Sequence, residues 1–400
     1  MTPNRAASVL HINVRLSEGG AAGVARTLCT ELQGRGFDVT FAYGYGPHGK
    51  ASTLSVPYPS FQITPKLIAG VHRANHIVLG HEAPIAIGTG WRKLEKVISE
   101  CDLVHLHVIH SYFLNMEKLF GLIKLYKKPV VWTLHDHWVL TGRCAQPAHC
   151  ELWMNGCGNC PSLTAYPPAL LDRSAVEKPK RTMAIDRLQN SVPSAIVACA
   201  EWLGRQAHTA GLKNVKVVRN SVDRSFWEAL TQSDRNRRDT GGANRLLFIC
   251  RDLRDRKKID WSLLQRLSQH GNVALTIVGD HAPSPMLDAR YLKATNDRSE
   301  LASLMAHNDT LIFTSKVDYY PLTIAEALTA GMKVIATDSP AAREFLHLPQ
   351  VKLLDDRTFD DRMLSEHRVE EDAEIASDFH PQRMTDEYVK IYSELMGRST

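Results

Sequence analysis

A chain of 400 residues, 44% hydrophobic and 23% charged, is long enough for two globular domains with sizeable cores. Its net charge of +5 suits an anionic ligand or an anionic membrane surface, and it is too weak to indicate nucleic-acid binding. No apolar run reaches the length of a membrane span and the first residues show no secretory signal. We therefore expect a cytoplasmic protein whose eight cysteines are reduced thiols or metal ligands.

The first half of the chain alternates segments typical of strands and helices. Residues 8–14 (SVLHINV) are apolar and β-branched, residues 19–36 have helical spacing and close on Gly36, and residues 38–46 read as a second strand. Further buried strands are predicted at 102–110, 128–136, 194–200 and 215–220. This order predicts a parallel sheet with helices on both faces.

The composition changes at residues 224–244, where polar, charged and glycine residues predict a linker or surface loop. A second α/β series follows, with strands predicted at 245–250, 273–280, 309–315 and 333–338. Residues 381–397 then form an amphipathic pattern that places Met384, Tyr388 and Tyr392 on one face of a helix.

These patterns predict an α/β protein of two doubly wound, Rossmann-like domains. The first comprises residues 1–222, the second residues 223–379, and a C-terminal helix at 380–397 is expected to pack back on the first. In such sheets ligands bind beyond the carboxyl ends of the strands. We therefore expect two facing domains with a ligand cleft between them.

An acidic pair follows the strand predicted at 309–315. Asp318 lies in the loop beyond the carboxyl end of that strand, and Glu326 lies about one and a half turns inside the next helix. The free N–H groups at the start of this helix, including those of Leu322 and Thr323, suit a phosphate. Two carboxylates beside an anion site suit a nucleotide sugar. The alternative, which the spacing alone does not exclude, is that Asp318 is an ordinary loop residue and Glu326 an ordinary solvated position on the helix.

The spacing of Asp318 and Glu326, with seven residues between them, resembles the C-terminal motif of retaining glycosyltransferases of family 4, which have the GT-B fold. The segment EALTAGMKVIAT, which starts at Glu326, is part of the same resemblance. Other segments resemble those of bacterial exopolysaccharide transferases, especially of the colanic-acid type. They are NVRLSEGGAAGVA, HLHVIHSYFLN, WTLHDHW, VRNSVD and DYYPL. Most members have glutamate where this chain has Asp318. The resemblance implies transfer of a hexose with retention of configuration and without a catalytic metal.

The resemblance also implies roles for residues of the second domain. Glu326 matches the glutamate that binds the donor ribose, and Asp318 matches the acid that contacts the donor sugar. Arg251 and Lys257 resemble the arginine and lysine that hold the donor diphosphate, with a register uncertain by one because Lys258 replaces the usual glycine. Without the resemblance, a basic segment of this kind is more often an ordinary solvent-exposed surface than a ligand site.

Residues of the first domain receive roles in the same way. Gly19 and Gly20 permit close approach of a ligand and open a helix, and in the family this loop faces the phosphates and the acceptor. His135, in WTLHDHW, matches the histidine near the transferred sugar, and His107 is a candidate acceptor contact. His135, Asp318 and Glu326 are thus the predicted catalytic residues.

Cys144, Cys150, Cys157 and Cys160 form a C-x5-C-x6-C-x2-C cluster. Four thiolates in one short segment fit a tetrahedral structural zinc site, with His149 as a spare ligand. Free thiols and disulfides are the alternatives.

The predicted partners are a nucleotide-sugar donor and a lipid-linked acceptor. UDP-galactose is the first expectation among UDP-hexoses, a GDP-sugar is the second, and the acceptor is an oligosaccharide on undecaprenyl diphosphate. Residues 116–129 are amphipathic and basic, and could touch the inner membrane surface.

The sequence leaves two other classes of protein as alternatives. A zinc-ribbon-bearing nucleic-acid-binding protein is favoured by the cysteines and a pI near 8.7, but the cations are spread along the chain. A nucleotide-sugar-modifying enzyme, an epimerase or dehydrogenase, would need a dinucleotide fingerprint and a Tyr-x-x-x-Lys motif, and the chain lacks both.

Overall fold

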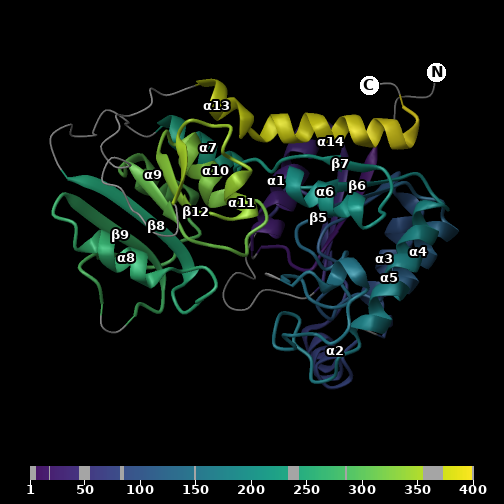
Figure 1. Cartoon of the computed structure of the whole chain (residues 1–400). Coiled ribbons are helices and arrows are strands. Elements are labelled where there is room, and N and C mark those ends of the chain that lie inside the picture. The colour runs from purple at the N-terminus through teal and green to yellow at the C-terminus, as the bar shows by residue number, and fades with distance from the viewer. Residues whose placement is uncertain are drawn as a thin grey trace. The chain divides into compact units, whose positions relative to one another are not determined.

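The computed structural model divides the chain into two compact units (Figure 1). One unit comprises Met1–Arg219 with Met384–Thr400, and the other comprises Asn220–Arg383. The structure describes residues 6–17, 19–44, 55–81, 85–147, 150–232, 243–283, 286–354 and 373–398. None of the helices in these ranges is both long and apolar enough to cross a bilayer.

The first unit is built on a seven-stranded parallel sheet of order β3-β2-β1-β4-β5-β6-β7. Its strands are β1 (Ser8–Asn13), β2 (Asp38–Tyr43), β3 (Ser60–Gln62), β4 (Leu103–Leu106), β5 (Val130–Leu134), β6 (Ser194–Ala198) and β7 (Val215–Val217). Its helices are α1 (Gly20–Gly34), α2 (Lys66–Leu79), α3 (Thr89–Glu100), α4 (Met116–Leu125), α5 (Ser174–Gln189) and α6 (Glu201–Thr209), with a 3-10 turn at Leu152–Asn155. The strand order reverses between β1 and β4, and such a switch point is where ligands bind in doubly wound sheets.

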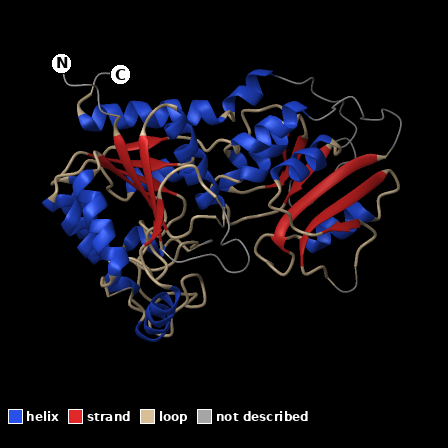
Figure 2. Cartoon of the chain, turned by 180° about the vertical axis from the view of Figure 1, so that it is seen from behind, coloured by secondary structure: helices blue, strands red, loops and turns tan. Residues whose placement is uncertain are grey.

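The second unit has a six-stranded parallel sheet of order β10-β9-β8-β11-β12-β13. Its strands are β8 (Asn244–Asp252), β9 (Val273–Asp280), β10 (Arg290–Leu292), β11 (Thr310–Phe313), β12 (Lys333–Thr337) and β13 (Val351–Leu354). Its helices are α7 (Arg224–Gln232), α8 (Trp261–Ser268), α9 (Arg298–Ala306), α10 (Leu322–Thr329), α11 (Pro340–Arg343) and α13 (Ala373–Asp378). Here the order reverses between β8 and β11. Figure 2 shows the strands of the two sheets in red among blue helices.

The C-terminal helix α14 (Pro381–Met396) returns the chain to the first unit. Met384, Tyr388 and Tyr392 are all buried, because residues four apart share one face of a helix. The Tyr392 hydroxyl lies 2.6 Å from His105 Nδ1, and the Tyr388 hydroxyl lies 2.8 Å from Thr133 Oγ1. The end of the chain is therefore hydrogen-bonded to β4 and β5.

The linker predicted at residues 224–244 is partly wrong. Residues 224–232 form α7, because Phe226 and Leu230 lie one turn apart and are both buried. Residues 233–242 lie outside the described ranges. The short strands β3, β10 and β13 were not predicted. Each pairs with a single neighbour at the edge of its sheet and has only three or four residues, too few for a periodic pattern.

Gly279 of β9 allows a close contact between neighbouring strands. A Cβ atom there would lie 2.2 Å from the Cys250 carbonyl oxygen and 2.6 Å from Leu253 Cγ. We expect Gly279→Ala to lower the free energy of unfolding by about 1–3 kcal/mol, because the backbone of β8 would have to shift. Urea denaturation measures this, with Gly271→Ala as the control, because a Cβ there meets no atom within 4 Å. Equal midpoints for the two variants would contradict the packing of β8 on β9.

Candidate active site

Histidines gather where β1, β4 and β5 lie side by side in the first unit. The strand register pairs His11 with His105, and His107 and His135 follow the ends of β4 and β5. His11 Nδ1 lies 3.1 Å from His107 Nε2, and His107 Nδ1 lies 3.1 Å from His135 Nε2. His11 and His107 are buried, whereas His135 is partly exposed. The structure thus brings the predicted residues His107 and His135 into direct contact.

These imidazoles are uncharged at neutral pH. Burial lowers the pKa of His135 to about 4 and that of His11 to about 3, and it also holds the pKa of His107 well below its usual value. A neutral ring has one donor and one acceptor nitrogen, so His135 can exchange a hydrogen bond with a sugar hydroxyl without adding charge.

A carboxylate next to His135 was not singled out in the sequence. Asp136 Oδ2 lies 2.8 Å from His110 Nε2, and its Oδ1 accepts a 2.9 Å hydrogen bond from the backbone N–H of Trp138. These contacts fix the loop that carries His135. The HDH triplet in WTLHDHW was the only signal in the sequence for this pair.

The glycines predicted at the ligand-facing loop lie at the start of α1. Gly19 is the N-cap with φ of 90°, a backbone conformation that residues with a side chain rarely adopt. Gly20 is the first helical residue, and no side chain caps this end of the helix. Because α1 follows β1, these amides lie beyond the carboxyl end of a strand at the switch point.

In the second unit, Asp318 is paired with a lysine. Its Oδ1 lies 2.7 Å from Lys258 Nζ, and this pair is partly buried. Burial alone would lower the pKa of Lys258, but the Asp318 carboxylate raises it. The neighbouring Lys257 is exposed, as is Arg251, which donates a 2.7 Å hydrogen bond to Asn296 Oδ1. Lys258 therefore lies against the predicted acid, whereas Lys257 reaches solvent.

Glu326 is buried on α10 and paired with an arginine. Its Oε1 accepts a 3.0 Å hydrogen bond from Arg298 Nη1 at the start of α9. Burial raises the pKa of Glu326 to about 7, although the Arg298 charge opposes the rise. Leu322 and Thr323 are the first residues of α10, behind the N-cap Pro321, and no side chain caps them. Their amides are available for an anion.

Sequence reasoning missed two cations of this group, Lys258 and Arg298. The uncertain register of the basic run was a signal for Lys258. Nothing in the spacing pointed to Arg298, because α9 and α10 are joined only through tertiary packing.

The cysteine cluster lies in the first unit between β5 and α5. Its members Cys144, Cys150, Cys157 and Cys160 are free and partly exposed. Cys157 Sγ accepts a 3.2 Å hydrogen bond from the Gly142 backbone, and Cys160 Sγ accepts one of 3.3 Å from Arg143 Nη2. Burial raises the pKa of Cys144 to about 11.

The donor chemistry of the cysteine cluster fits zinc, since four thiols lie in one segment. Within the described ranges, possible ligand atoms of His11, His105 and His107 lie within 4.8 Å of one another. The sulfurs of the four cysteines form no such group in these ranges. Arg143 orders the segment by donating 2.7 Å and 2.6 Å hydrogen bonds to the carbonyl oxygens of Ala165 and Ser162. His149 lies outside the described residues.

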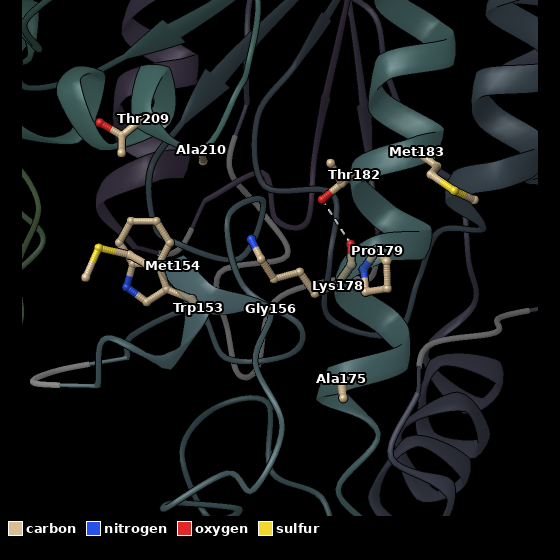
Figure 3. Close-up of a pocket in the computed structure, with 10 residues that line it drawn as sticks. All are labelled: Trp153, Met154, Gly156, Ala175, Lys178, Pro179, Thr182, Met183, Thr209 and Ala210. Carbon is tan, nitrogen blue, oxygen red and sulfur yellow. Dashed lines mark hydrogen bonds between the residues drawn. The ribbon is translucent and has the colours of Figure 1, made fainter.

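A cavity of about 500 Å³ lies beside this segment (Figure 3). Lys178 Nζ lies 6.0 Å from the centre of the Trp153 ring and donates a 2.7 Å hydrogen bond to the Leu140 carbonyl. The cavity is lined by Trp153, Met154, Gly156, Ala175, Lys178, Pro179, Thr182, Met183, Thr209 and Ala210. None of the predicted site residues is among them.

Comparison with known proteins identifies the family of the chain. The model of the family described as Glycosyltransferase Family 4 matches residues 18–226, and that of Glycosyl transferases group 1 matches residues 243–357. The chain is 33% identical over 353 residues to WcaC of Escherichia coli K12, named as a colanic acid biosynthesis glycosyl transferase, and the match covers 85% of each chain.

Solved structures show the same fold. HepE of Anabaena, solved with UDP and glucose, has a TM-score of 0.61 at 16% identity, covering 97% of this chain and 99% of that one. A sucrose-phosphate synthase of Thermosynechococcus elongatus has a TM-score of 0.62 at 14% identity, covering 98% and 100%. The chain therefore belongs to glycosyltransferase family 4, and it is an enzyme of the glycosyltransferase class with the GT-B fold.

Proposed function

We propose that this enzyme transfers a hexose, with retention of configuration, from a nucleotide sugar to a lipid-linked oligosaccharide during exopolysaccharide biosynthesis. The observation that carries the proposal is the paired charge around α10: Glu326 with Arg298, and Asp318 with Lys258, beside the uncapped start of that helix. Carboxylates suit sugar hydroxyls, and cations with free amides suit a diphosphate. The name of WcaC supports the biosynthetic role.

In this proposal each group meets one part of the donor. Glu326 accepts hydrogen bonds from the ribose hydroxyls, and Asp318 contacts the transferred sugar. Arg251, Lys257 and Lys258, with the amides of α10, offset the charge on the departing nucleoside diphosphate. No metal ion is then required at the diphosphate.

The first unit supplies uncharged contacts in the same proposal. The loop at Gly19 and Gly20 approaches the phosphates, His135 hydrogen-bonds to the transferred sugar, and His107 serves the acceptor side. The acceptor hydroxyl attacks the anomeric carbon on the face from which the nucleotide departs. Its proton passes to a donor phosphate oxygen as the carbon–oxygen bond to the diphosphate breaks.

A UDP-hexose is the proposed donor, with UDP-galactose tested first and GDP-sugars second. The support is that HepE of Anabaena has been solved with UDP and glucose and with UDP-glucose. The undecaprenyl-diphosphate-linked acceptor rests on the family resemblance.

Glu326→Gln tests the donor site. We expect affinity for the preferred nucleotide sugar to fall by about 2 kcal/mol, because the charged acceptor for the ribose is lost. Wild-type affinity should rise as pH increases through about 7, where Glu326 ionises, and the variant should lose this dependence. Calorimetry across a panel of UDP- and GDP-sugars, with EDTA present, measures both effects.

Glu300→Gln is the matched control, since Glu300 is an exposed carboxylate of the same unit on α9. It should bind the donor as the wild type does. Wild-type affinity in Glu326→Gln, or binding that needs added magnesium, would contradict the proposed donor site.

We also propose a structural zinc ion held by Cys144, Cys150, Cys157 and Cys160. Their ligand type and shared segment support it, and a closed thiolate site would order the segment without taking part in transfer. Elemental analysis of protein never exposed to a chelator should find about one zinc per chain, and Cys157→Ser should lower that content. Metal-free wild-type protein with free or disulfide-bonded cysteines would be incompatible with the site.

Contact with an anionic membrane surface is part of the proposal, but α2 supports it better than residues 116–129 do. The apolar residues of α4, including Leu119, Phe120 and Ile123, are buried in the fold, and only Leu125 is widely exposed. The apolar face of that segment is therefore already occupied.

By contrast, α2 presents an exposed apolar stripe. Leu67, Val71 and Val78 lie on one helical face and are 80%, 52% and 53% exposed. Leu170 and Leu171 extend the patch, because the Leu170 amide donates a 2.7 Å hydrogen bond to the Ile77 carbonyl on α2. The exposed cations Lys66 and Arg73 lie on the same helix, and the exposed Arg173 follows the two leucines, so this part of the surface carries positive charge that favours anionic lipid.

Leu67→Glu should reduce co-sedimentation with phosphatidylglycerol-containing vesicles about tenfold, because one leucine side chain no longer enters the lipid. Leu125→Glu is the matched control, since Leu125 is also a widely exposed leucine, on α4. Loss of binding in the control alone would assign the contact to residues 116–129 instead. Binding unchanged in both would remove the membrane contact from the proposal.

A further inference from the structure

His11, His107 and His135 form a continuous column of hydrogen-bonded imidazoles. The two N···N distances are both 3.1 Å, and the ring centres of each neighbouring pair are 5.4 Å apart. His107 is the middle member and contributes both of its nitrogens, Nε2 towards His11 and Nδ1 towards His135. The column runs from the buried strand β1 to the partly exposed end of β5.

The chemistry of a neutral imidazole couples the three rings. Each ring carries one N–H and one unprotonated nitrogen, and each N···N contact needs one of each. If His107 carries its proton on Nδ1, His135 must accept at Nε2 and carry its own proton on Nδ1, and His11 must donate from Nδ1. If His107 carries its proton on Nε2, all three rings carry theirs on Nε2.

We propose that His11 and His107 are positioning residues that fix the orientation and the tautomer of His135 through this column, so that the three rings share one tautomer. A mixed column would lose at least one of two hydrogen bonds in a buried site, where unpaired polar atoms are costly. The proposal rests on the proposed contact between His135 and the transferred sugar. The shared tautomer decides whether His135 Nδ1 donates to a sugar hydroxyl or accepts from it.

Burial supports the requirement that the rings stay neutral. The pKa of each of the three is lowered by desolvation, so none is expected to carry a second proton at neutral pH. The nearest carboxylate, Asp136, is engaged with His110 and the Trp138 backbone. The other flanking ring, His105, is stacked on His107 at 4.2 Å and is also held neutral by burial.

The deep end of the column is closed. His11 Nε2 is buried and has no hydrogen-bond partner among the described residues. No protein group that the structure describes can therefore accept a proton from this end of the column. The column orients His135 and does not conduct protons to solvent.

A metal ion is the competing occupant, since His11, His105 and His107 can bring three nitrogens to within 4.8 Å. The hydrogen bonds argue against it. His105 Nδ1 and Nε2 already contact Tyr392 and Thr133 at 2.6 Å and 2.8 Å, and both His107 nitrogens are used in the column. A metal ion would have to break several of these hydrogen bonds in a buried site.

Long-range ¹H–¹⁵N NMR of the imidazoles tests the proposal on the full-length protein labelled with ¹⁵N-histidine. Signals are assigned by single-histidine substitutions. We expect His11, His107 and His135 to show the same neutral tautomer in the wild type. Different tautomers among the three, or a protonated ring at neutral pH, would overturn the column. Because this readout needs no substrate, it decides the column independently of whether the donor is a nucleotide sugar.

His11→Phe tests the consequence for His135, since it keeps an aromatic ring but removes the hydrogen bond at the deep end. The His135 signal should change to a mixture of tautomers, and kcat should fall about tenfold at unchanged KM, the usual scale for losing an orienting partner behind a reacting group. His72→Phe is the control: His72 is also a buried, hydrogen-bonded histidine of this unit, on α2. It should leave the His135 signal unchanged.

Two results would refute the assignment even if His11→Phe folds poorly. One is a wild-type spectrum with mixed tautomers, as above. The other is bound metal whose amount is unaffected by Cys157→Ser but falls when His107 is replaced by Asn, because this would make the histidines ligands of an ion.

Discussion

The first unit depends on the need of buried imidazoles for hydrogen-bond partners. His105 sits inside the sheet, and an unpaired polar ring there would cost about 1–3 kcal/mol for each unsatisfied nitrogen. Its partners are Thr133 on β5 and Tyr392 on α14, a residue 287 positions later in the chain. Tyr388 also bonds to Thr133, so the last helix completes the polar core beneath β4 and β5. Without that return of the chain, His105 and Thr133 would lose these hydrogen bonds, in the two strands that lead to His107 and His135.

The two units use different electrostatics. Around His135 the first unit offers neutral imidazoles, because burial keeps the histidines unprotonated. The adjacent carboxylate of Asp136 is bonded to His110 and to the Trp138 backbone. Around α10 the second unit offers acid–base pairs, Lys258 with Asp318 and Arg298 with Glu326. Neutral groups suit sugar hydroxyls, and charged groups suit a diphosphate with its flanking sugars. The proposed contacts follow this difference: His135 is assigned to the transferred sugar, and the groups around α10 are assigned to the diphosphate and the ribose.

The charge pairs also have a consequence for specificity. Glu326 is held by Arg298 in a buried site, where its pKa is raised, so its carboxylate is already oriented and partly desolvated. A ligand hydroxyl that donates to the Glu326 carboxylate adds a hydrogen bond to a buried group that has few other donors. Preorganisation of this kind favours a ligand whose hydroxyls match the fixed oxygen positions. The pairing of Asp318 with Lys258 similarly gives the shorter acid a defined position.

The sequence by itself determined the fold class, because alternating strand and helix periods are local and repeat in both halves. It also determined the family, and the motif positions of His135, Asp318 and Glu326 followed from short segments. Edge strands such as β3 and the helix α7 were missed, since short or polar segments carry little periodic signal. Only the tertiary structure decided which side chains meet: Lys258 rather than Lys257 at Asp318, Arg298 at Glu326, and His11 behind His107. Those contacts depend on loop direction and on the register between strands distant in the chain, and neither is encoded in the spacing of neighbouring residues.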